Sequence, residues 1–249
     1  EAIRTQEKKR NPLPPFITST LQQEAFRRLR YSGQKTMVLA QQLYEGIDAG
    51  PEGATGLITY MRTDSTRTAP DALAEVRDFI QATYGAPYLP KEARHYRSRE
   101  TSQDAHEAIR PTSVARTPAS MRRHLDSDQY RLYELIWQRF VGSQMNPALV
   151  LTTTAEILAG PFLLRASGSR VKFDGFARAY ASTLIEESGP EASKLPALAQ
   201  GDMLKRHSIL PEQHFTEPPP RYTEASLVKI LEEKGILPDS IASSLTAVF

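Results

Sequence analysis

The chain has 249 residues, of which 40% are hydrophobic, and a formal net charge of +2 at pH 7. This length is sufficient for two or three packed units. No run approaches the ~20 apolar residues of a membrane span, so we expect a soluble protein that has no membrane partner. The absence of cysteine excludes disulfides and thiolate metal sites, and it fits a reduced cytoplasmic setting.

The near-neutral charge gives no global signature of nucleic-acid binding, but basic residues gather in short runs: EKKR, FRRLRYSGQK, HYRSR and MRRHL. Such runs can bind phosphate locally, although a single run is more often a solvated helix face. The polar start EAIRTQEKKR has neither an initiator methionine nor the apolar stretch of a secretory signal. We therefore expect that the chain begins inside a longer polypeptide.

The first two predicted units are a connector and a helical domain. Residues 1–19 are charged and then proline-rich, which indicates a linker and the end of a β-rich domain. Residues 20–147 form the helical domain, with Ser19 or Thr20 as the first N-cap. Pro70 suits a first helical position and Gly85 a stop. The helical periodicity occurs in LQQEAFRRLRYS, KTMVLAQQLYEGI, PDALAEVRDFIQATYG and DQYRLYELIWQRFVGSQM.

The remaining sequence predicts a β-rich unit and then a last helix. Residues 148–214 contain LVLTTTAEIL, PFLLRASGS and RVKFDGFARAY, which are rich in β-branched and aromatic residues and interrupted by Gly and Pro. Residues 215–249 turn helical at Thr223 or Glu224 and stop at Gly235. The fold class is therefore α+β and multidomain, with the helical domain inserted beside the β-rich one.

The stretch GLITYMRTDST, residues 56–66, places a tyrosine at the end of a short predicted strand. Alternation puts Tyr60 and Arg62 on the same side, about 6.5–7 Å apart. A tyrosine in this position usually packs, and a free phenol with a pKa of about 10 is a poor nucleophile at pH 7. A neighbouring guanidinium favours the phenolate and can hold a phosphate oxygen. The short polar groups suited to orienting a phosphate or sugar are Thr63, Asp64 and Ser65.

A second cluster is SQDAHEAIRPT, residues 102–112. On a helix His106 and Arg110 share one face, and Pro111 would end that helix. These two side chains can bind successive phosphates, or they can be a helix-end histidine and a structural arginine. A metal site at His106 is not predicted, because the adjacent Glu107 diverges on a helix and no third ligand has suitable spacing.

Together, PPFITSTLQQEA, GLITYMRTDST, SQDAHEAIRPT and FTEPPPRYTEASLVK resemble the ordered motifs of type IA DNA topoisomerases, from about Pro14 to about Ile236. The form YMRTDS is more similar to bacterial topoisomerase I than to topoisomerase III. The resemblance implies an isomerase that cuts one DNA strand through a 5′-phosphotyrosine intermediate and relaxes negatively supercoiled DNA by strand passage. It also implies a toroidal architecture, in which the helical domain carries the tyrosine and the β-rich domain forms an arch that opens.

By motif match, the resemblance makes Tyr60 the nucleophile and Arg62 the ligand of the scissile phosphate. His106 would contact the nearby backbone and Asp64 would support the site by hydrogen bonding. The other positions of the motifs assigned to DNA binding are Met61, Thr63, Ser65 and Arg110. The implied partner is single-stranded or negatively supercoiled DNA, bound by a monomer in the cytoplasm at the nucleoid.

The sequence departs from the family in two places. The acidic domain that holds Mg²⁺ has no counterpart, and we interpret the acidic DSD stretch at 126–128 as a helix N-cap. We therefore expect Mg²⁺ in the complete enzyme and none bound by this chain, which alone would be inactive or crippled. After Ile236, LPDSIASSLTAVF replaces the usual Gly-Arg-Pro-Ser-Thr-Tyr-Ala stretch.

Two other hypotheses compete with the enzyme. One is a non-catalytic module that binds single-stranded DNA through the same basic surfaces, with salt-dependent affinity and no need for the Tyr60 hydroxyl. The other is a tyrosine recombinase, but the YMRTDS context does not suit it.

Overall fold

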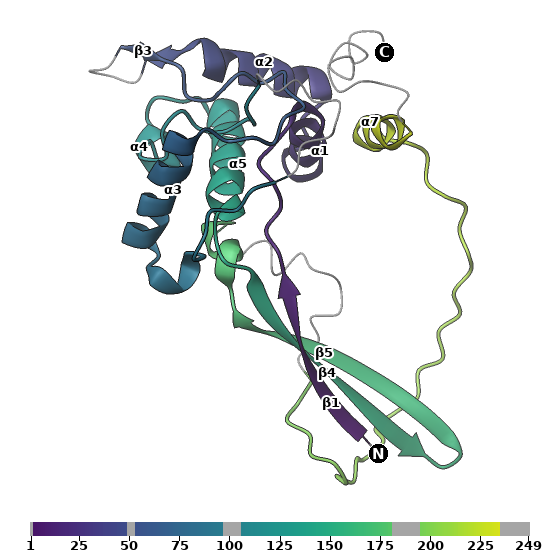
Figure 1. Cartoon of the computed structure of the whole chain (residues 1–249). Coiled ribbons are helices and arrows are strands. Elements are labelled where there is room, and N and C mark those ends of the chain that lie inside the picture. Colours follow the sequence, from purple (N-terminus) through teal and green to yellow (C-terminus); the bar gives the residue numbers. More distant parts are fainter. Residues whose placement is uncertain (1, 49–52, 97–105, 181–194, 235–249) are drawn as a thin grey trace.

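A helical unit and a long three-stranded sheet make up most of the chain, and the sheet projects from one end of the helical unit (Figure 1). The computed structural model describes residues 2–48, 53–96, 106–180 and 195–234. A last helix lies beside the helical unit and is reached through a long extended segment. The α+β class expected from the sequence is confirmed.

Turns and long loops join the helices of the helical unit. The helices are α1 (Thr18–Leu29), α2 (Gly33–Glu45), α3 (Pro70–Thr83), α4 (Pro118–Met121) and α5 (Ser127–Ser143), with the 3-10 helices η1 (Ala86–Tyr88) and η2 (Gly175–Tyr180). Two very short strands, β2 (Ile47–Asp48) and β3 (Ala54–Thr55), pair after α2. The last helix is α7 (Glu224–Glu233).

Helix α5 is the centre of the core. It packs against α1, α2, α4 and η2, and Leu132, Ile136 and Phe140 on it are fully buried. Two buried aromatic side chains also find polar partners: the Tyr133 hydroxyl donates to the Arg116 carbonyl at 2.6 Å, and the Trp137 indole donates to the Val114 carbonyl at 3.1 Å. Because buried polar groups are costly when unpaired, these bonds fix the loop before α4 against α5.

The helix ends follow the capping signals in most places. Asp126 caps α5, and its carboxylate accepts from the Asp128 and Gln129 amides at 2.8 Å each, which confirms the interpretation of the DSD stretch. Pro70 opens α3 as predicted. Helix α1 begins at Thr18, earlier than predicted, and Thr20 lies within its first turn, where its hydroxyl accepts from the Ile17 amide at 3.0 Å.

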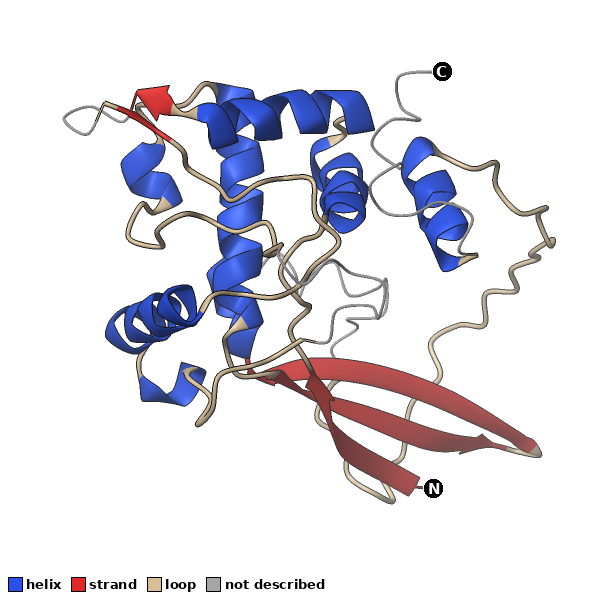
Figure 2. Cartoon of the chain, turned by 45° about the horizontal axis from the view of Figure 1, so that its top comes forward, coloured by secondary structure: helices blue, strands red, loops and turns tan. Residues whose placement is uncertain are grey.

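The sheet has the antiparallel order β1-β4-β5, with β1 (Ala2–Arg10), β4 (Ala148–Ala159) and β5 (Phe162–Phe173). Residues 1–19 were predicted as a linker and the end of a β-rich domain. Their charged first half is thus strand β1. In the predicted β-rich unit 148–214, strands occupy 148–173, and the described residues 195–214 contain neither helix nor strand. Figure 2 shows the three strands leaving the helical unit together.

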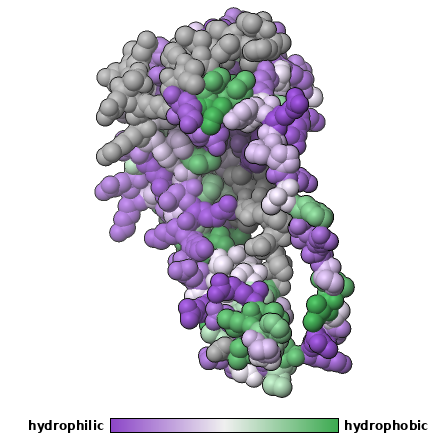
Figure 3. Space-filling view, turned by 90° about the vertical axis from the view of Figure 1, so that its right-hand side faces the viewer, coloured by the Kyte–Doolittle hydropathy of each residue, from purple (hydrophilic) through white to green (hydrophobic). Residues whose placement is uncertain are grey.

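The far end of the sheet is apolar and exposed. The large hydrophobic side chains that are more than half exposed there are Leu158, Phe162, Leu163 and Leu164. Figure 3 shows apolar side chains gathered at this lower end of the molecule. Isolated exposed apolar residues are ordinary, but a contiguous group indicates a surface that another body covers.

Helix α7 docks on the opposite side of the molecule from α3, against α1 (Figure 1). The Glu224 carboxylate accepts from the Gly33 amide at 3.2 Å, at the start of α2, and Val228 is buried. Among the described residues, no helix is long and apolar enough to cross a membrane.

An ion-pair cluster on α1 makes the fold sensitive to acid. The Glu24 carboxylate accepts from Arg27 at 2.9 Å and from Arg28 at 2.6 Å. Burial alone would raise the pKa of Glu24, but the Arg27 hydrogen bond and the charges of Arg139, Arg27 and Arg28 outweigh it and lower the pKa below its ordinary value of 4.5.

Because the pKa of Glu24 is lower in the folded state, its contribution is present above about pH 4.5 and is lost as the pH falls through the folded pKa. We expect Glu24→Gln to destabilise the fold by about 1 kcal/mol at pH 7 and by less at pH 3. Urea unfolding at both pH values measures this. An equal loss at both would contradict the role of the Glu24 charge.

Candidate active site

Three segments that are far apart in the sequence meet around Tyr60. Ile109 forms a bridge with Phe16, and Ile58 forms one with Pro111. The Ile109 amide donates to the Phe16 carbonyl at 2.8 Å, and the Thr59 amide donates to the Arg110 carbonyl at 2.9 Å. The structure thus brings together the motifs PPFITST, GLITYMRTDST and HEAIRPT, with the third segment pairing to both others.

The local structure of two motifs differs from the prediction. The GLITY stretch is not a regular strand, since Ile58 alone in it forms a bridge. The helix predicted over 102–110 is wrong for 106–110, which are described without helix, while 102–105 lie outside the described residues. A residue before proline is pushed toward extended backbone, and Pro111 has this effect on Arg110. His106 and Arg110 are therefore not held together by helical spacing.

The Tyr60 side chain is 44% exposed, on the surface of the site rather than in the core. Its ring contacts the ring of Tyr44, with centroids 5.3 Å apart and planes at 64°. Within the described ranges, the Tyr60 hydroxyl has no hydrogen-bond partner, and neither the exposed Arg62 nor the half-buried Asp64 has one. The described residues therefore do not use these three polar groups to hold the fold.

The other motif residues are buried and shape the loop. Met61 is 1% exposed and belongs to the hydrophobic core, and Thr63 and Ser65 are also buried. The Thr63 hydroxyl accepts from the Ser65 amide at 3.0 Å, and the Ser65 hydroxyl accepts from the Arg67 amide at 3.2 Å. These side chains, predicted as DNA-binding, hold the backbone turn that follows Tyr60 in this structure.

His106 and Arg110 lie on the third segment. His106 is half-buried next to the undescribed residues 97–105. Arg110 pairs with Glu107 at 2.7 Å, and its guanidinium also donates to the Pro111 carbonyl at 3.0 Å. Arg110 is thus already engaged within the protein, as in the structural alternative stated for it, whereas no partner of His106 is found in the described part of the chain.

Thr18, at the start of α1, fixes the turn after Tyr60. Its hydroxyl donates to the Met61 carbonyl at 2.8 Å and accepts from the Thr63 amide at 2.9 Å. Its own amide donates to the Thr63 carbonyl at 2.9 Å. Thr18 belongs to the TSTLQQ stretch of the first motif, which the resemblance makes structural or adjacent to DNA. Sequence reasoning missed Tyr44, which showed only helical apolar spacing.

We expect Thr18→Val to destabilise the fold by about 1–3 kcal/mol, since it leaves a buried carbonyl and a buried amide without their partner. The two side chains have nearly the same shape, and Thr18→Ser, which keeps the hydroxyl, is the control. Urea unfolding of both variants gives the difference. A Thr18→Val variant as stable as Thr18→Ser would show that the hydroxyl does not hold the turn.

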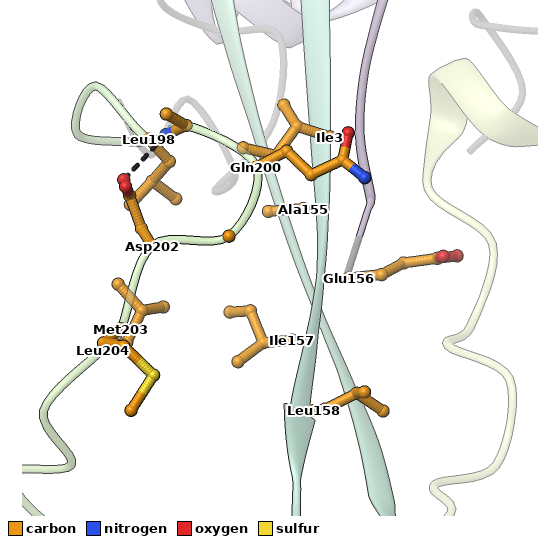
Figure 4. Close-up of a pocket in the computed structure, with 12 residues that line it drawn as sticks. Ile3, Ala155, Glu156, Ile157, Leu158, Leu198, Gln200, Asp202, Met203 and Leu204 are labelled. Carbon is orange, nitrogen blue, oxygen red and sulfur yellow. Dashed lines mark hydrogen bonds between the residues drawn. The ribbon is translucent and has the colours of Figure 1, made fainter.

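No group of three or more His, Asp or Glu side chains in the described part of the chain could hold a metal ion. The described residues therefore do not by themselves form a site for the Mg²⁺ of the family. A cavity of about 410 Å³ lies elsewhere, between the sheet and residues 198–204 (Figure 4). Ile3, Ile157 and Leu204 are among the residues that line it, and it includes none of the residues around Tyr60.

The chain is similar to known DNA topoisomerases in sequence and in fold. Residues 1–240 match the family described as DNA topoisomerase. DNA topoisomerase 1 of Rickettsia felis is 47% identical over 251 aligned residues, which cover 100% of this chain and 32% of that protein. Full-length topoisomerase I from Thermotoga maritima is 37% identical with a TM-score of 0.80, covering 100% of this chain and 39% of that one.

The chain therefore belongs to the bacterial, type IA DNA topoisomerase I family. It spans about a third of the length of the curated relative that it matches.

Proposed function

We propose that this chain is the part of a type IA DNA topoisomerase that carries the nucleophile, and that Tyr60 is this nucleophile. The observation that carries the proposal is the exposed phenol of Tyr60 on a loop held by two other motif segments. A nucleophile needs an accessible oxygen and a fixed backbone, and both are present.

In the proposed reaction the Tyr60 hydroxyl loses its proton and its oxygen attacks a phosphorus atom of one DNA strand. The bond from phosphorus to the 3′ oxygen breaks, that oxygen takes up a proton, and the 5′ phosphate becomes esterified to Tyr60. The 3′ hydroxyl later attacks the same phosphorus, and the phenol leaves again. Because one ester replaces another in each direction, resealing needs no ATP.

We assign the remaining roles by position and charge. Arg62 is exposed without an ion pair among the described residues, so its guanidinium is available to neutralise the scissile phosphate. His106 would donate to a neighbouring phosphate and Asp64 would orient a donor in the site. The loop residues Met61, Thr63 and Ser65 would set the position of Tyr60.

We assign three further features to the complete protein. They are the Mg²⁺ site, the toroidal arrangement with a β-rich arch, and relaxation of negatively supercoiled DNA by strand passage. We propose DNA as the partner of a monomeric enzyme in the bacterial cytoplasm, associated with the nucleoid. These proposals rest on the family, in which the relatives are named DNA topoisomerases.

The position of the label on the DNA tests the chemistry. The complete protein is incubated with single-stranded DNA and Mg²⁺ and then denatured. With 3′-labelled DNA we expect a labelled protein adduct, and with 5′-labelled DNA a free shortened fragment. Label retained on the protein from the 5′-labelled strand would overturn the 5′ linkage. Salt-dependent binding without any adduct would favour the non-catalytic module.

A further inference from the structure

We propose that Tyr44 is a positioning residue for the nucleophile, holding the Tyr60 ring in the orientation from which its hydroxyl reacts. The inference rests on the proposed function of Tyr60. It adds a residue that lies outside the recognised motifs, on the last turn of α2.

The backbone around Tyr44 is joined directly to the segment that leads to Tyr60. The Leu57 amide donates to the Leu43 carbonyl at 2.7 Å. A Cβ on Gly56 would lie 2.7 Å from the Tyr44 carbonyl oxygen, so glycine allows the two backbones to approach this closely. The end of α2 and the start of the Tyr60 segment are therefore held against each other.

The rings of Tyr44 and Tyr60 contact each other. Their centroids lie 5.3 Å apart at an interplanar angle of 64°, which is an edge arrangement that aromatic pairs prefer. Tyr60 is 44% exposed and Tyr44 is 40% exposed, so the core does not enclose either ring. In the described part of the chain, the Tyr44 ring is the aromatic contact of Tyr60.

A freely rotating phenol would spend part of its time in rotamers from which the oxygen cannot reach the phosphate. Ordering a reactive group before the reaction raises the rate without raising affinity. The Tyr44 hydroxyl has no partner in the described part of the chain, so the effect belongs to the ring. Phenylalanine at position 44 should therefore preserve the positioning of Tyr60, and an aliphatic residue there should not.

The variants Tyr44→Leu and Tyr44→Phe are compared in the complete protein, with Val38→Ala as the control for a change on the exposed surface of α2. Single-turnover cleavage is measured at saturating single-stranded DNA, and the Kd for the same DNA is measured separately. We expect Tyr44→Leu to cleave about threefold to tenfold more slowly, with a Kd within twofold of the wild type. Tyr44→Phe and Val38→Ala should stay within twofold in both.

Two results would overturn the proposal. One is cleavage by Tyr44→Leu at the wild-type rate. The other is a weakened Kd with an unchanged rate at saturation, which would make Tyr44 a contact of the DNA.

A second measurement does not depend on activity. It tests the ring contact even if Tyr44→Leu folds poorly or the proposed function is wrong. Fluorotyrosine is incorporated into the complete protein, and the Tyr60 signal is assigned by its loss in Tyr60→Phe. We expect Tyr44→Phe to leave this ¹⁹F resonance in place and Tyr44→Leu to move it. An unmoved resonance in Tyr44→Leu would show that the rings do not contact each other in solution. An adduct that persists in Tyr60→Phe would instead reject the proposed function.

Discussion

Replacing Tyr60 by phenylalanine will abolish the covalent protein–DNA adduct and leave DNA binding within about twofold of the wild type. The substitution removes one oxygen atom from a side chain whose hydroxyl has no partner in the described part of the protein. The fold should therefore lose little stability. Without that oxygen no phosphotyrosine can form, and we expect cleavage to fall by about 10³-fold or more. Denaturing gels with 3′-labelled DNA measure the adduct.

Tyr44→Phe is the matched control for this experiment. It removes the same atom from a neighbouring tyrosine of similar exposure, and it should retain the adduct. If both variants keep it, Tyr60 is not the nucleophile. If both lose it, the hydroxyl of Tyr44 takes part in the chemistry, and the assignment of that residue to a positioning role is wrong.

Gly175→Ala will have the largest effect on stability. Gly175 has φ +51°, and a Cβ there would lie 2.4 Å from the Pro147 carbonyl oxygen and 2.6 Å from that of Asn146. The left-handed conformation costs a residue with a side chain about 1–2 kcal/mol, and overpacking adds about 1–3 kcal/mol. We expect a total destabilisation of about 2–5 kcal/mol, measured by urea or thermal unfolding.

Gly160→Ala separates the two contributions. Gly160 has a similar φ of +61°, in the turn between β4 and β5, and a Cβ there would meet nothing within 4 Å. This variant should show the conformational cost alone, about 1–2 kcal/mol. Equal losses in the two variants would mean that the contact with Pro147 relaxes at no cost.

The sequence predicted the helices better than the sheet, for a physical reason. A helix such as α5 repeats its apolar residues every three to four positions, and this local pattern identifies it. Strand β1 is AIRTQEKKR, and its last seven residues are exposed, so it lacks the alternation that marks a half-buried strand. Its partner is β4, with Ala2 opposite Glu156, and no local signal reports a pairing over such a separation.

The site was also only partly predictable from the sequence. The motif around Tyr60 was recognisable, and its resemblance led to the family that the comparisons support. Its surroundings were not predictable, because the segment HEAIRPT contains no helix where it is described and pairs with two other segments. Tyr44 fitted the apolar spacing of α2, and helical spacing alone cannot show that a ring lies against a residue sixteen positions later.

The sheet has the geometry of a long arm. Its strands join the helical unit at one end (Figure 1), where Arg10 pairs with Ala148 and Leu149 with Phe173. The twelve residues of β4, at about 3.3 Å each, give an arm of about 40 Å. A rotation of about 10° at the base would therefore carry the apolar tip through about 7 Å. Gly175 lies two residues after the end of β5 at this base, so a small backbone adjustment there would be amplified into a large displacement at the far end.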